Sequence, residues 1–228
     1  MVEILLLDLD DTILDFHKAE RRALTKTLES FGLVVTDQVR QLYSRINRGY
    51  WEALERKEVT REQLLTGRFR SLFEALGMTV DEAAVAKTYE DNLSQGHEFF
   101  PGAEEALQSL YGKYPMYIVS NGTKRVQDGR LDSAGIRKYF EDIFISQDLG
   151  ADKPDPLFFQ RCFAQIPNFD REKTMIVGDS LSSDILGGKN AGIRTCWVNV
   201  RALPMPESDP PDHVIESLAQ LEALLETL

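Results

Sequence analysis

The chain contains 228 residues, of which 43% are hydrophobic and 28% are charged, a balance typical of a globular protein with one substantial core, alone or with a small accessory domain. Its 26 Lys and Arg residues against 37 Asp and Glu residues give a formal net charge of −11. This charge argues against nucleic acid as the main partner, because contact with many phosphates requires a basic surface, but it permits a small anionic substrate.

The predicted strands are short apolar runs that end in polar clusters. The first is Ile4–Leu7, which leads into Asp8, and a continuous run of this kind suits a strand buried on both faces of a parallel sheet. Similar runs occupy residues 116–119, 143–145, 175–177 and 195–198. Helix-length segments lie between and after them at 102–112, 123–134, 156–165, 182–191 and about 215–226. This alternation predicts an α/β fold with a doubly wound parallel sheet, in which ligands bind outside the carboxyl ends of the strands.

A long segment after the first strand interrupts this alternation. Residues 15–96 show helical periodicity and contain no strand-like run. We therefore predict a small all-helical cap domain at 15–96, inserted into an α/β core domain formed by residues 1–14 and 97–228. The connecting segments at about 14–18 and 96–101 are the expected hinges.

The cellular setting follows from what the sequence lacks. No apolar run reaches the roughly 20 residues that span a bilayer, and the first apolar stretch ends at Asp8 with no basic region before it, unlike a signal peptide. Cys162 and Cys196 are too few and too far apart for a disulfide framework, so we expect buried, reduced cysteines. We expect a cytoplasmic monomer or homodimer with no membrane or nucleic-acid partner.

The polar cluster from Asp8 to Thr12 is the first candidate for chemistry. Asp8, Asp10 and Asp11 place three carboxylates within four residues at the end of a buried strand. Like charges repel one another there unless a cation neutralises them, and carboxylate oxygens are ligands that magnesium accepts. Taken alone, the pattern also fits a solvated acidic turn or a helix N-cap.

Three further clusters follow other predicted strands. Asp179 ends a buried strand and is followed by Asp184, which adds carboxylates at the same edge of the sheet. Ser120 and Asn121 offer a hydroxyl, an amide and backbone N–H groups at the start of a helix, where anions bind. Lys153 brings a cation beside a proline-stiffened turn. Together these groups can bind a phosphoryl group and a metal.

The order and spacing of these clusters resemble the haloacid dehalogenase superfamily across essentially the whole predicted core. Its four motifs match here as Asp8-x-Asp10-x-Thr12, Ser120, Lys153 and Gly178-Asp179 with Asp184. The resemblance is specific because residue identity, order and spacing agree together. It implies the doubly wound core and the inserted cap that the element pattern also predicts.

The resemblance implies a covalent, two-step phosphate transfer. Asp8 would attack phosphorus and form an aspartyl phosphate, while Asp10 would protonate the leaving alcohol and later deprotonate the hydrolytic water. Magnesium, the implied cofactor, would be held by the Asp8 carboxylate and the backbone carbonyl of Asp10. Asp179 and Asp184 would complete the metal site, Asp184 either directly or through water. Members that displace a halide usually carry another residue at position 10, so Asp10 favours phosphate esters.

Four residues are implied in substrate binding. Ser120 and Lys153 would contact the phosphoryl oxygens, and Thr12 and Asn121 would orient the loops around them. Two positions depart from the family pattern: Asp11 replaces a residue that is often Gly, and Asp152 precedes Lys153, where a small residue is common. The Asp152 carboxylate is expected to lower the effective positive charge near the phosphate.

Parts of the sequence outside the motifs resemble the bacterial pyrimidine 5′-nucleotidase subgroup, which acts on standard and noncanonical pyrimidine nucleotides. The matching stretches are residues 47–51, 67–69, 183–192 and 195–197. The expected substrate is therefore a small phosphate ester, specifically a pyrimidine nucleoside monophosphate. Phosphoglycolate, a sugar phosphate or a phosphomutase reaction are alternatives. A catalytically silent binding protein is a further alternative, which the intact pair of Asp8 and Asp10 argues against.

The helical insertion offers candidates for base recognition. The stacking candidates are Tyr43, Tyr50, Trp51 and Phe69, and the candidates for reading the base edge are Asn47, Arg48 and Arg68. Aromatic residues at helical spacing more often form the core of a small helical domain, and arginines on its surface are more often solvated. Both interpretations stay open at the level of sequence.

Overall fold

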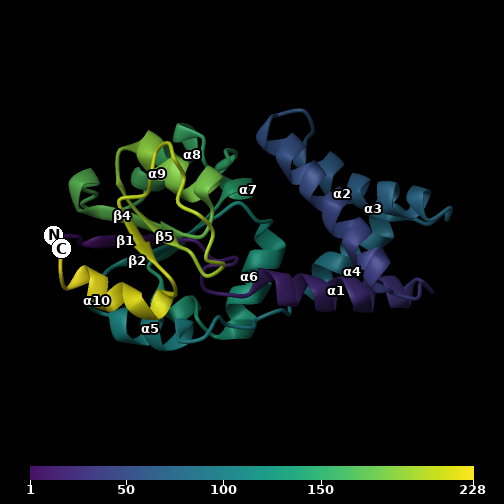
Figure 1. The fold of residues 1–228 in the computed structure, drawn as a ribbon, viewed down its shortest axis with the longest axis horizontal. Coiled ribbons are helices and arrows are strands. Elements are labelled where there is room, and N and C mark those ends of the chain that lie inside the picture. Colours follow the sequence, from purple (N-terminus) through teal and green to yellow (C-terminus); the bar gives the residue numbers. More distant parts are fainter. The chain divides into compact units, whose positions relative to one another are not determined.

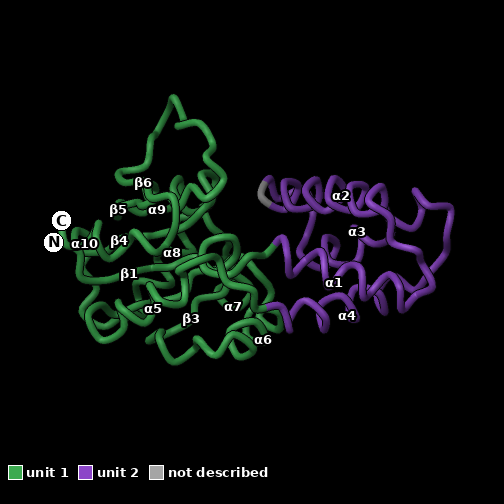
Figure 2. Tube along the Cα trace, turned by 60° about the horizontal axis from the view of Figure 1, so that its bottom comes forward, with its two compact units in different colours: residues 1–16, 97–228 green, residues 17–96 purple. Residues whose placement is uncertain are grey.

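The computed structural model describes residues 1–54 and 56–228 with their side chains, and Glu55 by its backbone alone. Two compact units make up the chain (Figure 2). The first consists of residues 1–16 and 97–228, and the second of residues 17–96. Each unit has its own secondary structure and is described separately.

The first unit is built on a six-stranded sheet in which all pairings are parallel (Figure 1). Its strands are β1 (Ile4–Leu7), β2 (Met116–Ser120), β3 (Asp142–Ile145), β4 (Thr174–Gly178), β5 (Arg194–Val198) and β6 (His213–Ile215). They lie in the order β3-β2-β1-β4-β5-β6. The order reverses direction between β1 and β4, and this reversal confirms the predicted doubly wound α/β fold.

Helices cover both faces of this sheet. They are α5 (Ala103–Leu110), α6 (Lys124–Ala134), α7 (Ser146–Leu149), α8 (Pro156–Phe163), α9 (Leu186–Ala191) and α10 (Leu221–Leu225). Successive side chains of β1 point to opposite faces, so Leu5 and Leu7 join one core layer while Ile4 and Leu6 join the other. A strand buried in this way must be apolar at every position, which is why its sequence is a continuous hydrophobic run.

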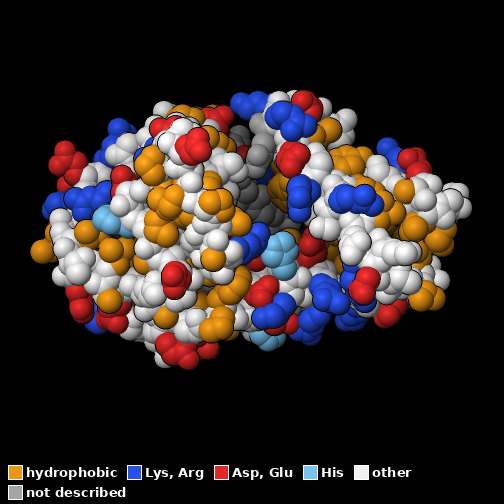
Figure 3. Space-filling model, in the orientation of Figure 1, with side chains coloured by type: hydrophobic (Ala, Val, Ile, Leu, Met, Phe, Trp, Pro, Cys, Tyr) orange, Lys and Arg blue, Asp and Glu red, His pale blue; other side chains and the backbone are white. Residues whose placement is uncertain are grey.

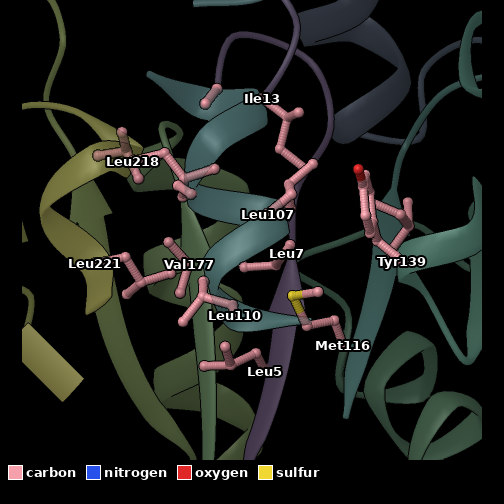
Figure 4. Packing of buried hydrophobic residues seen from close by; sticks show 14 of the residues in the cluster. Leu5, Leu7, Ile13, Leu107, Leu110, Met116, Tyr139, Val177, Leu218 and Leu221 are labelled. Carbon is pink, nitrogen blue, oxygen red and sulfur yellow. The ribbon is translucent and has the colours of Figure 1, made fainter. Parts of the chain in front are cut away.

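The core layer on one face packs β1, β2 and β4 against α5 and the C-terminal segment. Figure 4 shows Leu5 and Leu7 beside Leu107 and Leu110 of α5, with Leu218 and Leu221 on the C-terminal side. The opposite layer contains side chains of α8 and α9. Because both layers are filled by helices, the strand ends are the places where this sheet can present polar groups to a ligand.

The C-terminal segment differs from the sequence-based prediction. A single helix was expected at about 215–226, but residues 213–215 form β6, followed by a short 3-10 turn at 218–220 and by α10. Val214 pairs with Trp197 of β5, so this strand extends the sheet at its edge. Three residues are too few to show a period of two, and only pairing with β5 reveals the strand.

The second unit is all-helical. Its helices are α1 (Phe16–Ser30), α2 (Asp37–Glu55), α3 (Arg61–Ala75) and α4 (Glu82–Leu93), with Phe16 itself in the first unit. Thr36 and Thr60 cap α2 and α3 by accepting backbone N–H groups. The interior contains the aromatic group Tyr43, Phe69 and Tyr89.

The surface carries both signs of charge. On the face shown in Figure 3, Lys and Arg side chains alternate with Asp and Glu side chains on each unit. Among the described residues, no helix is long and apolar enough to span a lipid bilayer.

Candidate active site

The predicted site residues of the first unit gather at the carboxyl ends of the central strands. Asp8 directly follows β1 and Asp179 directly follows β4, and these two strands are paired in parallel, with Leu7 opposite Val177. Ser120 is the last residue of β2, the other neighbour of β1. The polar clusters therefore surround the point where the strand order reverses, which is where ligands bind in sheets of this kind.

Three carboxylates form a compact group at this edge. Oxygen atoms of Asp8, Asp179 and Asp184 all lie within 4.8 Å of one another. Asp184 is held by the backbone N–H of Ser180, which donates to its Oδ2 at 3.0 Å. A Cβ at Gly178 would lie 2.2 Å from the same oxygen, so only glycine leaves room for this carboxylate at the end of β4.

Lys153 supplies the positive charge of the site. Its Nζ donates to Oδ1 of Asp8 at 2.7 Å, to Oδ1 of Asp184 at 2.6 Å and to the carbonyl of Val119 at 2.7 Å. The side chain is almost fully buried. With three acceptors around its three N–H groups, the ammonium is fully hydrogen-bonded.

Asn121 fixes the backbone of Lys153. Its Nδ2 donates to the Lys153 carbonyl at 2.9 Å, and its Oδ1 accepts the Lys153 N–H at 2.8 Å. The side-chain amide therefore holds both polar groups of that residue. This geometry gives Asn121 the part of orienting the lysine loop from the end of β2.

Burial and mutual repulsion shift the ionisation of the carboxylate group. Burial raises the pKa of Asp8 well above its usual range, and neighbouring carboxylates add to the effect while Lys153 opposes it. Burial and the nearby Asp184 raise the pKa of Asp179 to about 8. Burial works to lower the pKa of Lys153, but Asp184 and Asp8 outweigh it and raise the pKa above its usual value.

The carboxylate group has the properties of a divalent-cation site. One ammonium lies among three carboxylates, and burial, followed by repulsion from the neighbouring carboxylates, raises the pKa of Asp8 and Asp179. Hard oxygen donors of this kind suit Mg²⁺. The residues present therefore fit the metal that the sequence led us to expect.

Asp10 lies apart from these three carboxylates. Its Oδ2 accepts a hydrogen bond from Gln127 Nε2 at 2.6 Å, and its Oδ1 lies 3.2 Å from a guanidinium nitrogen of Arg130. Both partners belong to α6. The two aspartates of the first motif thus have different surroundings: Asp8 contacts an ammonium inside the carboxylate group, whereas Asp10 contacts an amide and a guanidinium.

Two hydroxyl residues of the predicted site also contact the aspartates or their neighbours. The hydroxyl of Thr12, which is fully buried, donates to Oδ2 of Asp8 at 3.3 Å. Ser120 Oγ accepts the backbone N–H of Gly122 at 3.1 Å and Nε2 of Gln127 at 2.7 Å. Thr12 is therefore placed to orient Asp8.

Sequence reasoning missed Gln127, Arg130 and the pair formed by Asp11 and Arg201. Arg201 donates to Oδ2 of Asp11 at 2.6 Å, from a loop that follows β5. Gln127 and Arg130 are three residues apart in a helix, so they share one face. Their spacing on the helix that follows Ser120 is a signal in the sequence, but a polar helical face is common and does not by itself indicate a site.

In the second unit, four of the candidates for base recognition, Tyr43, Asn47, Arg68 and Phe69, are buried in its interior. Tyr43 and Phe69 are buried and stacked with ring centroids 5.5 Å apart. Arg68 is also buried and donates to Oδ1 of Asn47 at 2.9 Å. Arg48 is exposed. The aromatic pair thus serves as core, which is the interpretation that the helical spacing favoured.

The fold and the composition of this site define a class of protein. The chain matches the haloacid dehalogenase-like hydrolases over residues 5–198, and it belongs to that family. Two relatives along nearly the whole chain are named pyrimidine 5′-nucleotidases. PynA of Streptococcus pneumoniae is 38% identical over 96% of this chain and 93% of its own length. YjjG of Escherichia coli is 32% identical over 96% of this chain and 95% of its own length.

Solved structures show the same architecture. A protein of Bacillus subtilis named as a HAD-hydrolase, YfnB, was crystallised with magnesium and has a TM-score of 0.93 to this chain at 38% identity, covering 98% of each. An L-2-haloacid dehalogenase of Xanthobacter autotrophicus, at 17% identity and a TM-score of 0.79, shares the fold. From its family and relatives, this chain is a phosphatase of the haloacid dehalogenase family.

Proposed function

We propose that the protein is a magnesium-dependent phosphomonoesterase that acts on pyrimidine nucleoside monophosphates through an aspartyl phosphate. The observation that carries this proposal is the group formed by Asp8, Asp179 and Asp184 within 4.8 Å, with the buried ammonium of Lys153 against it. The substrate class rests on the two nucleotidase relatives, which match along nearly the whole chain.

Asp8 is the proposed nucleophile. Its carboxylate is held from two sides, by Lys153 at Oδ1 and by Thr12 at Oδ2, so its orientation is fixed before substrate binds. In the first step a bond forms between an Asp8 oxygen and phosphorus, and the bond between phosphorus and the ester oxygen breaks. In the second step water attacks phosphorus, and the Asp8 carboxylate is released with inorganic phosphate.

Asp10 is the proposed general acid and base. It gives its proton to the leaving nucleoside oxygen in the first step, and it takes a proton from the attacking water in the second. The proton count closes over one cycle, since Asp10 returns to its starting state. Asp10 contacts Gln127 and Arg130 of α6, so this acid and base has different partners from the carboxylates around Lys153.

The residues that would hold magnesium are Asp8, Asp179 and Asp184, with the backbone carbonyl of Asp10. When bound, the ion would neutralise negative charge on the carboxylates and on the phosphoryl oxygens. Lys153, whose three N–H groups are directed to Asp8, Val119 and Asp184, is proposed to stabilise the phosphoryl oxygens by its positive charge. The hydroxyl of Ser120 is the proposed hydrogen-bond donor to a phosphoryl oxygen. Asn121 acts through Lys153, whose backbone it holds.

The all-helical unit of residues 17–96 is the proposed cap, and the connections at about 14–18 and 96–101 are the proposed hinges. Support comes from YfnB, whose magnesium-bound structure reveals interdomain movement. A cap that closes on substrate excludes water during the first step and admits it for the second.

The proposed function is tested by phosphate release from UMP, dUMP and dTMP, with AMP and phosphoglycolate for comparison. We expect turnover of the pyrimidine nucleotides with Mg²⁺, none with EDTA, and none in Asp8→Asn. Asp132→Asn is the matched control, because Asp132 is exposed and forms an ion pair with Arg137 on the surface. Efficient turnover of phosphoglycolate together with no turnover of pyrimidine nucleotides would refute the substrate assignment. Full activity in Asp8→Asn would refute the mechanism.

A further inference from the structure

The helix α6 presents two polar side chains to the residues proposed for catalysis. Gln127 is almost fully buried and Arg130 is 0% exposed. Buried polar side chains in a helix are costly unless they are paired, so their presence calls for a reason. Both contact Asp10, and Gln127 also contacts Ser120.

The amide of Gln127 joins two residues of the site. Its Nε2 lies 2.6 Å from Oδ2 of Asp10 and 2.7 Å from Oγ of Ser120. An ionised carboxylate accepts hydrogen bonds and cannot donate, so the group facing Asp10 is the NH₂ of the amide. Its two N–H groups are then directed to the two residues, one to each.

This arrangement decides what the Ser120 hydroxyl can do. Its oxygen already accepts hydrogen bonds from Gly122 N at 3.1 Å and from Gln127. A hydroxyl has two acceptor positions and one proton. With both acceptor positions filled, the hydroxyl proton is left to be donated, which is what a phosphoryl oxygen requires.

Arg130 places a buried positive charge beside Asp10. Its guanidinium nitrogens form no hydrogen bond to the described residues, and its ion pair among these residues is the 3.2 Å contact with Oδ1 of Asp10. The guanidinium also stacks over the ring of Phe16, with 5.7 Å between its carbon and the ring centroid. Its charge therefore acts on Asp10.

The glycine that ends the Ser120 cluster gives independent support. A Cβ at Gly122 would lie 2.4 Å from Nε2 of Gln127. A side chain at position 122 would therefore occupy the space that the Gln127 amide fills. The end of β2 and the face of α6 fit each other at the atom that contacts both Asp10 and Ser120.

We propose that Gln127 and Arg130 are positioning residues that fix the Asp10 carboxylate for proton transfer. This proposal rests on the function proposed above, in which Asp10 is the acid and base. Gln127 holds one carboxylate oxygen and Arg130 the other, so the carboxylate cannot turn freely. Loss of either contact slows the steps in which Asp10 moves a proton.

The test uses two substrates that differ in their need for an acid. The phenol of 4-nitrophenyl phosphate leaves without protonation, so only the second step needs Asp10, whereas UMP needs Asp10 in both steps. In Gln127→Met, we expect a burst of one 4-nitrophenolate per enzyme at close to the wild-type rate. Steady turnover should fall about 10- to 100-fold on both substrates, with a burst only for the aryl ester.

A double-mutant cycle shows whether Gln127 acts through Asp10. If it does, adding Gln127→Met to Asp10→Asn should lower turnover less than about twofold beyond Asp10→Asn alone. Gln108→Met is the matched control, since Gln108 is exposed on α5 and bonds to Glu104. Arg130→Met should lower turnover about tenfold, and Arg130→Lys should restore part of it, because the charge returns without the planar guanidinium that lies over Phe16.

The outcomes separate the two proposals. Wild-type turnover in Gln127→Met, or fully additive losses in the cycle, would overturn the positioning role. A smaller burst amplitude with unchanged turnover per active enzyme would show a folding defect and would also overturn the positioning role. Gln127→Asn repeats the measurement with a shorter amide that cannot reach Asp10. If Asp10→Asn itself keeps full activity, the proposed function has failed instead.

Discussion

At the scale of single residues, Lys153 connects stability with chemistry. Its ammonium is buried and contacts Asp8 and Asp184. Lys153→Met leaves these carboxylates without their cation, and we expect the free energy of unfolding at pH 7 to fall by about 3–5 kcal/mol. Lys173→Met is the control, because Lys173 pairs with Glu3 on the surface and its loss should leave the free energy of unfolding nearly unchanged. Urea denaturation with EDTA present measures both, and equal midpoints would contradict the assignment.

The raised pKa of Asp179 predicts a pH dependence in the metal-free protein. In the unfolded chain this carboxyl titrates near its usual value of 3.8, and in the folded protein its pKa is about 8. Between these values the folded state holds a proton that the unfolded state has lost, so the free energy of unfolding falls as pH rises. Asp179 contributes a slope of at most about 1.4 kcal/mol per pH unit.

Denaturation at pH 5, 6, 7 and 8 in EDTA measures this slope. Asp179→Asn cannot titrate, so its stability should change less across the same range. Saturating Mg²⁺ should also flatten the profile of the wild-type protein, because the cation takes the place of the proton. Identical slopes for the wild-type protein and Asp179→Asn would show that another group is responsible.

At the scale of elements, the end of β4 is shaped to admit a carboxylate. In Gly178→Ala the new Cβ would lie 2.2 Å from Oδ2 of Asp184, so this carboxylate must move. We expect the Mg²⁺ concentration for half-maximal activity to rise about 10- to 100-fold. The measurement is activity as a function of Mg²⁺ concentration. An unchanged half-maximal concentration would show that Asp184 takes no part in binding the metal.

A second glycine gives the opposite expectation and serves as control. Gly49 lies within α2, and a Cβ there would meet nothing within 4 Å. Alanine is the better helix former, so Gly49→Ala should stabilise the protein by about 0.5–1 kcal/mol without changing its Mg²⁺ requirement. Thermal unfolding measures the shift, and destabilisation would show that α2 uses this position for packing.

At the scale of the whole molecule, the two cysteines report on both core layers of the first unit. Cys162 belongs to the layer with α8, and Cys196 to the layer with α5. Burial raises the pKa of each thiol to about 12. We expect both to resist iodoacetamide at pH 8 until the unit unfolds, with labelling rates that follow the unfolding equilibrium. Fast labelling of one cysteine in the folded protein would show that its layer opens separately.

The residues whose chemistry depends on strand ends could be identified from the amino-acid sequence. Asp8, Ser120 and Asp179 each follow or end an apolar run, and parallel strands bring such ends to one edge whatever the details of packing. The all-helical character of the second unit was also visible, since apolar residues recur at helical spacing in several segments of it and no strand-like run occurs there. The short strand β6 was not visible, because three residues carry no pattern of their own.

Sequence therefore determined which groups meet at the sheet edge, since backbone hydrogen bonding fixes the alignment of parallel strands. Tertiary structure alone decided what touches the second aspartate: Gln127 and Arg130 reach Asp10 only because α6 packs against the sheet with that face inward. Tertiary structure alone also decided that the Asn121 amide forms two hydrogen bonds with the backbone of Lys153. Helix orientation depends on the side chains of the whole core, and no local pattern contains that information.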